Sequence, residues 1–529
     1  MQFLNTPLKH FTYVGVVHLN FSFEKITTLK KISILLSVFT LSVIVSCSQA
    51  PKKKNSFTIK GPVASEINTS YGWVNTDSAY TLKDFRGKIV LLDFWTLGCI
   101  NCQHVIPGLH KLQEKYPNEL VEIGVHSAKF TSEKQTQRIR DAIAKFGIDH
   151  PVVNDADYKV WDSYGVQAWP TLVLISPDGK IVMTQSGEDV YNIFDGQIQK
   201  LINEYAGEID TIPFIFKQRN IQQAASVLKF PSKIIAGGNN TIWISDNGNN
   251  RIVNIDETGK ILQVIGKGGR GFTNGTFAEA TFNEPQGMAI KNNILFIADS
   301  KNNAIRAANL SAKTVTTIAG NGQMGYYFDD AKWDVPILPN SPWDLLIDSD
   351  YLYIADAGNH QILRMNLNDN NVFRFAGSGR EGIQDGNLKQ CSFSQPSGIT
   401  RDANFVYVAD PEASAIRQLD IERKTVKTIV GKGLFDFGDK DGKAKNALLQ
   451  HCAGLTASSG NVYIADTYNG KVKVLDQKTN TVTTLVSGLD EPNGILVLGN
   501  ELWITDTNNN QIIKYNLIKR TKQIVNVRM

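Results

Sequence analysis

The C-terminal part of the chain repeats itself, and this repetition constrains the fold more than any other feature. Six segments, WISD, FIAD, YIAD, YVAD, YIAD and WITD, each end in an aspartate. An isoleucine or valine stands six residues after each aspartate, and an asparagine stands three residues after five of them. The fourth unit departs, with Ala413 in place of the asparagine. The six aspartates are Asp246, Asp299, Asp356, Asp410, Asp466 and Asp506.

Each unit has room for about four short strands. A four-stranded sheet cannot bury both of its faces alone, so units of this size are stable when they stack radially as propeller blades. Six units predict an all-β, six-bladed propeller over residues 232–529. Long inserted loops between units, expected on the surface, are the predicted variable binding surface; three of them span residues 271–287, 381–398 and 437–454.

The recurring aspartate and asparagine predict structural roles. An aspartate at a strand end, followed by an asparagine in the left-handed region, can hold a tight turn through hydrogen bonds from side chain to backbone. A ring of catalytic acids is the alternative, and it is weaker because catalysis rarely needs six copies of one group. The units resemble NHL repeats. That resemblance implies a propeller but no particular activity.

Residues 57–205 read as a separate α/β domain, followed by a linker over residues 206–231. Two apolar runs, at 88–95 and 119–127, predict buried strands with a helix between them. After Ser132, with Gln135 as its capping partner, a second amphipathic helix is predicted. A hairpin follows, and alternating strands and helices indicate an α/β fold. The fold class is therefore multidomain.

Cys99 and Cys102 lie three residues apart, just after the first buried strand and at the start of a helical pattern. At a helix N-terminus, unpaired backbone N–H groups and the helix dipole favour thiolate over thiol, and thiolate is the attacking form. The second cysteine lies one turn deeper. It can attack a mixed disulfide on the first and release the substrate. The pattern predicts a redox dithiol, with Cys99 as the exposed attacking thiol and Cys102 as the shielded one.

The domain resembles the membrane-anchored TlpA/ResA-like branch of the thioredoxin fold, through TLKDFRGKIVLLDFWTLGCINC, HPVVNDAD and AWPTLVLISPDGKI. This resemblance implies that Cys99 is the nucleophile and Cys102 the resolving thiol. It implies that Trp95 lies beside the site and that Pro170 is the cis-proline that faces the disulfide. It also implies that Asp93 is a buried acid that deprotonates the resolving cysteine, since burial raises its pKa.

Two positions depart from the thioredoxin pattern. Gly98 stands where thioredoxins usually carry tryptophan, and Ile100-Asn101 replaces Gly-Pro or Pro-Pro. These positions tune the reduction potential, so the sequence leaves the direction of the reaction open. The order of the two domains, together with CINC, IGVHSAKF and FAGSG, makes the whole chain similar to the NHL repeat-containing protein 2 family.

The N-terminus predicts export and lipid anchoring. Lys30-Lys31 precedes an apolar run at 32–46, which is shorter than the roughly 20 residues that span a bilayer. The run ends in a sequence that resembles the bacterial lipoprotein box, so residues 1–46 read as a signal peptide, with a start that is over-extended, and 47–56 as a tether lipidated at Cys47. The alternatives are a plain signal peptide or one anchor helix. The expected location is the bacterial cell envelope, facing the periplasm or the cell surface.

Composition and spacing argue against other classes of function. With 55 basic and 51 acidic residues the net charge is only +4, and no basic face accompanies a nucleic-acid motif, so nucleic acid is not an expected partner. A structural zinc site needs two further ligands, and no second Cys-x-x-Cys exists. His104 lies two residues after Cys102, which excludes the haem attachment motif. No cofactor is expected; a copper role with His104 or His126 is a minor alternative.

We therefore expect a membrane-anchored thiol–disulfide oxidoreductase whose propeller docks a protein client. A second partner would donate or accept the electrons. The alternative is a non-catalytic binding scaffold with a vestigial thioredoxin-like domain. In the propeller, Cys391 and Cys452 either pair or remain buried free thiols; the sequence leaves both readings open.

Overall fold

The computed structural model describes residues 61–217, 226–326 and 333–529. The predicted signal peptide, Cys47 and the tether lie outside the described residues. Within the part that is described, no helix has the length and apolar character needed to cross a membrane. The thioredoxin-like domain and the propeller belong to the same compact unit, residues 57–529.

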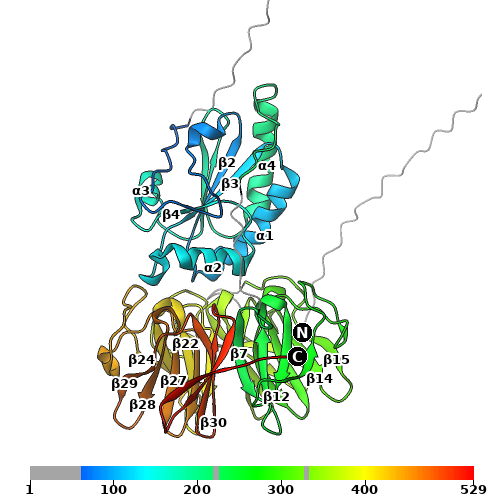
Figure 1. The fold of residues 1–529 in the computed structure, drawn as a ribbon, viewed down its shortest axis with the longest axis vertical. Helices are drawn as coiled ribbons and strands as arrows, with labels where there is room; N and C mark the ends of the chain where they lie inside the picture. The colour runs from blue at the N-terminus through cyan, green and yellow to red at the C-terminus, as the bar shows by residue number, and fades with distance from the viewer. Residues whose placement is uncertain (1–60, 218–225, 327–332) are drawn as a thin grey trace, which may run out of the picture. The chain divides into compact units, whose positions relative to one another are not determined.

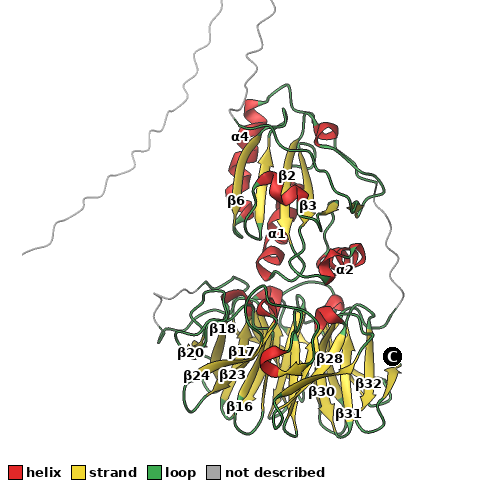
Figure 2. Ribbon diagram, turned by 90° about the vertical axis from the view of Figure 1, so that its left-hand side faces the viewer, coloured by secondary structure: helices red, strands yellow, loops and turns green. Residues whose placement is uncertain are grey.

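A six-stranded sheet forms the first domain, with strand order β1-β4-β3-β2-β5-β6 (Figure 2). The central strands β2, β3 and β4 run parallel, and β1, β5 and β6 are antiparallel to their neighbours. The apolar runs of the sequence form β2 and β3, whose residues are all buried. The strands are β1 (Trp73–Val74), β2 (Ile89–Trp95), β3 (Leu120–His126), β4 (Val152–Asn154), β5 (Thr171–Ile175) and β6 (Ile181–Ser186).

Four helices cover the sheet: α1 (Ile100–Lys115), α2 (Thr136–Phe146), α3 (Lys159–Tyr164) and α4 (Val190–Glu204). On one face, α1 and α4 pack on alternate residues of β2, and α2 packs around Trp95. On the other face, α3 joins the core around Phe94. The second predicted helix is present, but its predicted cap is wrong. Ser132 belongs to a short 3-10 turn, and Gln135 is the N-cap.

Six separate sheets follow, and they form the six blades that the repeats predict (Figure 1). The first strand of each blade contacts the first strand of the next, and blade six contacts blade one, so the ring is closed. The first three blades contain β7 (Pro231–Ala236), β8 (Ile242–Asp246), β9 (Arg251–Ile255) and β10 (Ile261–Ile265); β12 (Pro285–Lys291), β13 (Ile294–Asp299), β14 (Ala304–Asn309) and β15 (Thr314–Ala319); and β16 (Pro342–Asp348), β17 (Tyr351–Asp356), β18 (Gln361–Asn366) and β19 (Val372–Ala376).

The remaining blades contain β21 (Gly398–Arg401), β22 (Val406–Asp410), β23 (Ala415–Asp420) and β24 (Thr425–Val430); β26 (Gly454–Ser458), β27 (Asn461–Asp466), β28 (Lys471–Asp476) and β29 (Thr481–Val486); and β30 (Pro492–Leu498), β31 (Glu501–Asp506), β32 (Gln511–Asn516) and β33 (Thr521–Val525). The three inserted loops each add a two-residue outer strand to their blade. These strands are β11 (Gly275–Thr276), β20 (Gly386–Asn387) and β25 (Gly442–Lys443).

The ring closes without exchanging a strand between its ends. The last strand, β33, pairs with β32 in its own blade. Beyond it, Arg528 forms a single parallel bridge with Lys260 of blade one. At the inner side, the Thr507 hydroxyl donates to the Pro231 carbonyl at 2.8 Å. Side-chain bonds and one bridge therefore join the last blade to the first.

The six aspartates have structural roles, as predicted, but they hold a different segment. In each blade one carboxylate oxygen accepts a backbone N–H, at 2.6–2.8 Å, from the loop that enters the blade 16 or 17 residues earlier. In five blades the other oxygen accepts from the asparagine three residues later. The prediction that this asparagine is left-handed is wrong, because the next residue adopts that conformation: Asn250, Asn303, His360, Ser414, Gly470 and Asn510.

These left-handed residues join neighbouring blades. The side chain of each, except Gly470, accepts the backbone N–H of the residue that enters the following blade, at 2.7–3.2 Å. The last such bond runs from Phe230 to Asn510 and closes the ring. Each entry residue also has a positive φ. Two backbone positions with positive φ in each blade therefore fix the rim of the propeller, the end at which the loops enter the blades.

Replacement of two of the aspartates is expected to separate the hydrogen-bonding role from the charge. Asp299 and Arg306 are both fully buried and 2.6 Å apart, so Asp299→Asn leaves a buried guanidinium without its counter-charge and should destabilise the fold by about 3 kcal/mol. Burial raises the pKa of Asp356 to about 8, so it is largely protonated at neutral pH and Asp356→Asn should cost less than about 1 kcal/mol. Urea unfolding at pH 7 measures the free energy of unfolding of both variants. Equal losses of stability would contradict the assignment of a charge role to Asp299 and a neutral role to Asp356.

Candidate functional site

Cys99 and Cys102 form an unbridged pair at the start of α1. Cys99 is the N-cap residue, and its Sγ accepts the backbone N–H of Cys102 at 3.2 Å. Such a bond to the cap position stabilises a thiolate more than a thiol. Burial and the neighbouring Cys99 sulfur raise the pKa of Cys102 well above its ordinary value. The geometry is therefore that of an attacking position followed by a shielded thiol.

The sheet brings the other predicted site residues to the same edge. β5 pairs with β2 up to Thr171 opposite Phe94, so Pro170 lies beside the end of β2 that leads to Cys99. The Trp169–Pro170 bond is cis. Trp95, the last residue of β2, packs in one apolar cluster with both cysteines. Its ring meets the buried His126 edge to face, with centroids 4.9 Å apart.

Asp93 lies deeper on β2, on the same side as Trp95, and is 5% exposed. Burial raises the pKa of its carboxyl to about 7. The charge of Asp93 is one of the influences that raise the pKa of Cys102, which shows that the two groups are close enough to interact. A carboxyl with this pKa can accept a proton near neutral pH.

Glu133, which the sequence analysis did not single out, holds the loop before Cys99. Its buried carboxylate accepts the Thr96 hydroxyl at 2.6 Å and the Gly98 N–H at 2.9 Å. It also accepts the Phe130 N–H at 3.0 Å. A single side chain thus connects the cysteine loop to the segment around Phe130. No motif marks such a residue, because its partners are backbone groups and one hydroxyl.

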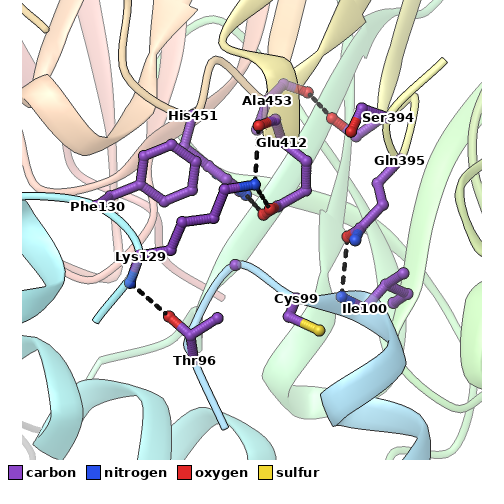
Figure 3. A network of polar contacts seen from close by, with 12 residues as sticks. Thr96, Cys99, Ile100, Lys129, Phe130, Ser394, Gln395, Glu412, His451 and Ala453 are labelled. Atoms are coloured by element: carbon purple, nitrogen blue, oxygen red, sulfur yellow. Dashed lines mark hydrogen bonds and ion pairs between the residues drawn. The ribbon is translucent and has the colours of Figure 1, made fainter. Parts of the chain in front are cut away.

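The propeller covers this site (Figure 3). The Gln395 side chain accepts the Ile100 N–H, the first of α1, at 2.9 Å. The Lys129 ammonium bonds to the carboxylate of Glu412 and, at 3.0 Å, to its backbone carbonyl. Both side chains of this ion pair are more than nine-tenths buried. His451 lies 3.4 Å from Glu412 and completes the cover.

Gly98 makes this close approach possible. A Cβ on Gly98 would lie 2.7 Å from an oxygen of Glu412 and 2.8 Å from a ring nitrogen of His451. Its φ is not positive, so space and not backbone freedom requires glycine here. The departure from the thioredoxin pattern at this position therefore has a physical reason, because propeller side chains occupy the volume that a tryptophan would fill.

Two positions that recur in the blades supply several of the contacts with the thioredoxin-like domain. One is the residue two after the conserved aspartate. It varies among the units, as Lys301, Glu412 and Tyr468 illustrate, and these contact Gln103, Lys129 and Phe130. The other is the left-handed entry residue, which includes Gln395 and His451. Variation at a fixed place in an otherwise regular repeat marks where a contact surface can lie, but it does not identify the segment that the surface contacts.

The expectation that Cys99 is exposed is wrong, since it is only 6% exposed. Gln395 and His451, from the inserted loops 381–398 and 437–454, contact the chain's own thioredoxin-like domain. That these loops also bind a partner stays a prediction. The cavity that remains beside Ile100 has a volume of about 70 Å³. It has room for a few water molecules and none for a polypeptide.

The other candidate residues do not gather into a site. Among the residues that are described, no three histidine, cysteine or acidic side chains are arranged to hold a metal ion. His104 lies 2.7 Å from Glu188 and 2.6 Å from Ser341. Cys391 and Cys452 are unpaired, buried thiols in different core clusters.

Comparison with known proteins agrees with this architecture. A model of the thioredoxin-like family matches residues 87–181. The chain is 39% identical to protein SUPPRESSOR OF QUENCHING 1, chloroplastic, of Arabidopsis thaliana over 85% of its own length, and it spans only 46% of that protein. It is 36% identical to NHL repeat-containing protein 2 of Gallus gallus over 84% of its own length and 69% of the relative. Over 23% of the chain it is 33% identical to thiol-disulfide oxidoreductase ResA of Bacillus anthracis, of which it spans 67%.

Gly98→Ala is expected to loosen the cover over Cys99. Overfilling a packed contact costs about 1–3 kcal/mol, so iodoacetamide should label Cys99 in the folded, reduced protein about tenfold faster. Gly196→Ala, in α4 where an added Cβ meets nothing within 4 Å, is the matched control and should leave the rate unchanged. An unchanged rate in Gly98→Ala would show that this contact does not limit access.

Proposed function

The chain belongs to the NHL repeat-containing protein 2 family. We propose that it is a membrane-anchored thiol–disulfide oxidoreductase of the bacterial cell envelope whose propeller docks a protein client. The observation that carries the proposal is the position of Cys99, which caps α1 with its sulfur held by the Cys102 N–H. Asp93, beside the second thiol, supplies a group whose pKa, about 7, suits proton transfer. Residues of the first domain are similar to a thiol–disulfide oxidoreductase, ResA, and this similarity supports the same chemistry.

The reaction is a double thiol–disulfide exchange. The Cys99 thiolate attacks a client disulfide, one client sulfur leaves with the electron pair and takes a proton, and a mixed disulfide forms. Cys102 then gives its proton to the Asp93 carboxylate and attacks Cys99. The second client sulfur leaves, and the enzyme holds a Cys99–Cys102 disulfide. A partner dithiol restores the pair; with a dithiol client the steps run in reverse.

Access to Cys99 requires the cover to move. Gln395, Glu412 and His451 occupy the side from which a client would approach, and the cavity of about 70 Å³ excludes a peptide. We propose that a client engages the propeller and separates these contacts. Lys129 and Glu412 are the pair most affected, because each of these buried charges exchanges its partner for water when the cover opens.

A non-catalytic scaffold is the second candidate, and the burial of Cys99 favours it. In that case the propeller and the thioredoxin-like domain form one rigid body, and the cysteines are packed residues of its interior. The two candidates differ in a measurable way, because only the enzyme needs its thiols to cycle. A measured reduction potential of the pair would also distinguish a reductase from an oxidase.

Cys102→Ser is expected to accumulate mixed disulfides with clients through Cys99, because the thiol that releases them is gone. Cys99→Ser should trap none, and Cys391→Ser, a buried thiol within the propeller, should behave as wild type. Non-reducing electrophoresis and mass spectrometry of proteins captured in cells measure this. The enzyme proposal fails if Cys102→Ser traps no partner and the wild-type pair cannot be cycled between dithiol and disulfide.

Lipid attachment at Cys47 is proposed from the apolar run and the cysteine that ends it. A thioether-linked diacylglycerol adds two chains, and two chains suffice for stable membrane binding where one does not. Cys47→Ala should abolish incorporation of labelled fatty acid and release the protein from the membrane fraction. Ser48→Ala should keep the lipid. Label on the Cys47→Ala protein would refute the assignment.

A further inference from the structure

A cluster of buried polar groups lies beneath the dithiol without hydrogen bonds. Among the described residues, no partner exists for Asp93 Oδ1, for either oxygen of Glu122, for either ring nitrogen of His150 or for the Trp95 indole nitrogen. Glu122 is 3% exposed and His150 is 2% exposed. Native proteins satisfy the great majority of buried polar groups, so several unpartnered groups in one region require an explanation.

The sheet register brings these groups together. β2 and β3 are parallel, with Asp93 opposite Gly124 and Leu91 opposite Glu122, so the side chains of Asp93 and Glu122 point to the same face. Gly124 leaves open the space between them. An added Cβ there would lie 3.0 Å from the Trp95 nitrogen and 3.3 Å from the His150 Nε2. The His150 Nδ1 lies 3.7 Å from Glu122 Oε2.

This cluster leads from the second cysteine toward the surface. At its inner end, Asp93 influences the pKa of both Cys102 and Glu122. At its outer end, His150 is close enough to His110 for the charge of one to lower the pKa of the other. The His110 side chain is 28% exposed and lies 4.0 Å from the exposed carboxylate of Asp149. His110 also lines two solvent-open pockets.

Glu122 and His150 are neutral at neutral pH, whereas Asp93, with a pKa of about 7, divides between the acid and the carboxylate. Burial, with the Asp93 charge, raises the pKa of Glu122 well above its ordinary value, and burial lowers the pKa of His150 to about 3. Glu122 therefore holds a proton, and the neutral His150 accepts one at one ring nitrogen only as it gives one up at the other. The buried His126 on β3, whose pKa burial also lowers to about 3, adds no charge on this face. One proton can thus move between sites without creating a permanent buried ion.

We propose that Asp93, Glu122 and His150 form a proton relay that connects Cys102 to solvent at His110. The inference rests on the proposed oxidoreductase function and extends it. The role of Asp93 follows from its place in the redox site; the assignment of Glu122, His150 and His110 is new. The gap of 3.7 Å between Glu122 and His150 is less than 1 Å beyond hydrogen-bonding distance, so a small side-chain rotation closes it.

Each transfer balances. The Cys102 S–H bond breaks as Asp93 takes the proton, and the sulfur keeps the electron pair with which it attacks Cys99. Protonated Asp93 passes a proton to Glu122 while Glu122 gives its own to His150. His150 passes a proton to His110, which releases it to water. Asp93 is again a carboxylate, Glu122 is again protonated, and one proton has left the protein.

The cover over the dithiol is the reason that such a path is useful. Cys102 is 2% exposed, and the propeller lies over the side of the pair that faces away from the sheet. Solvent therefore does not reach Cys102 directly. The relay runs in the opposite direction, through the interior of the thioredoxin-like domain.

The test measures the two exchange steps separately in the full chain, with bis(2-hydroxyethyl) disulfide, which is far smaller than a peptide, as the probe. In a Cys102→Ser background, quenched mass spectrometry reports the attack of Cys99 alone. With both cysteines present, it reports closure of the internal disulfide. Glu122→Gln should slow closure about tenfold at pH 7 and change its pH profile, because acid–base assistance typically contributes a hundredfold or more. The attack of Cys99 should be unchanged.

His150→Gln is the second variant and should slow closure similarly, whereas Glu114→Gln, an exposed residue of α1, is the control. Redox-difference infrared spectra should contain the carbonyl band of a protonated carboxyl that Glu122→Gln removes. If both variants close at the wild-type rate with the wild-type pH profile, the relay is overturned while the oxidoreductase stands. If the wild-type pair never forms a disulfide, the proposed function fails, and the relay with it.

Discussion

The hydrogen bond from the entering loop to the buried aspartate side chain of each blade is the interaction on which the rest of the molecule depends. By accepting a backbone N–H from the loop 16 or 17 residues earlier, each aspartate fixes the segment that enters its blade. Those segments carry Gln395 and His451, and the turn after Asp410 carries Glu412. The contacts that cover the dithiol therefore exist because acids in the propeller hold its rim in one conformation.

The parts of this structure that local patterns encode were predictable. Repeats at regular spacing gave six blades, and the apolar run at 89–95 gave the central strand. The cover was not predictable from such patterns, because Ile100 and Gln395 are 295 positions apart and pair through a backbone N–H that any residue possesses. Gly98 was the available sign: an unexplained loss of a bulky side chain beside a reactive residue indicates that something else fills the space.

The thioredoxin-like core combines tight packing with groups that packing does not satisfy. One oxygen of Asp93, both oxygens of Glu122 and both ring nitrogens of His150 are buried without hydrogen bonds, an arrangement that lowers stability most when the groups are charged. Real proteins break the rules of a well-formed core mainly where chemistry needs it. Sequence reasoning identified Asp93 through a family resemblance, whereas Glu122 looked like one charged residue within an apolar strand, and His150 like a residue of a turn.

Each blade pairs only its own strands, and this affects how the chain folds during synthesis. Each blade consists of one continuous stretch of sequence, so its strands can pair as soon as they leave the ribosome. The Asn510 side chain and Arg528, which join the last blade to the first, are translated after the other five blades. Until then the five earlier blades form an open arc with an unsealed edge. Residues 510–528 thus decide when the ring stops offering that edge to chaperones and to other chains.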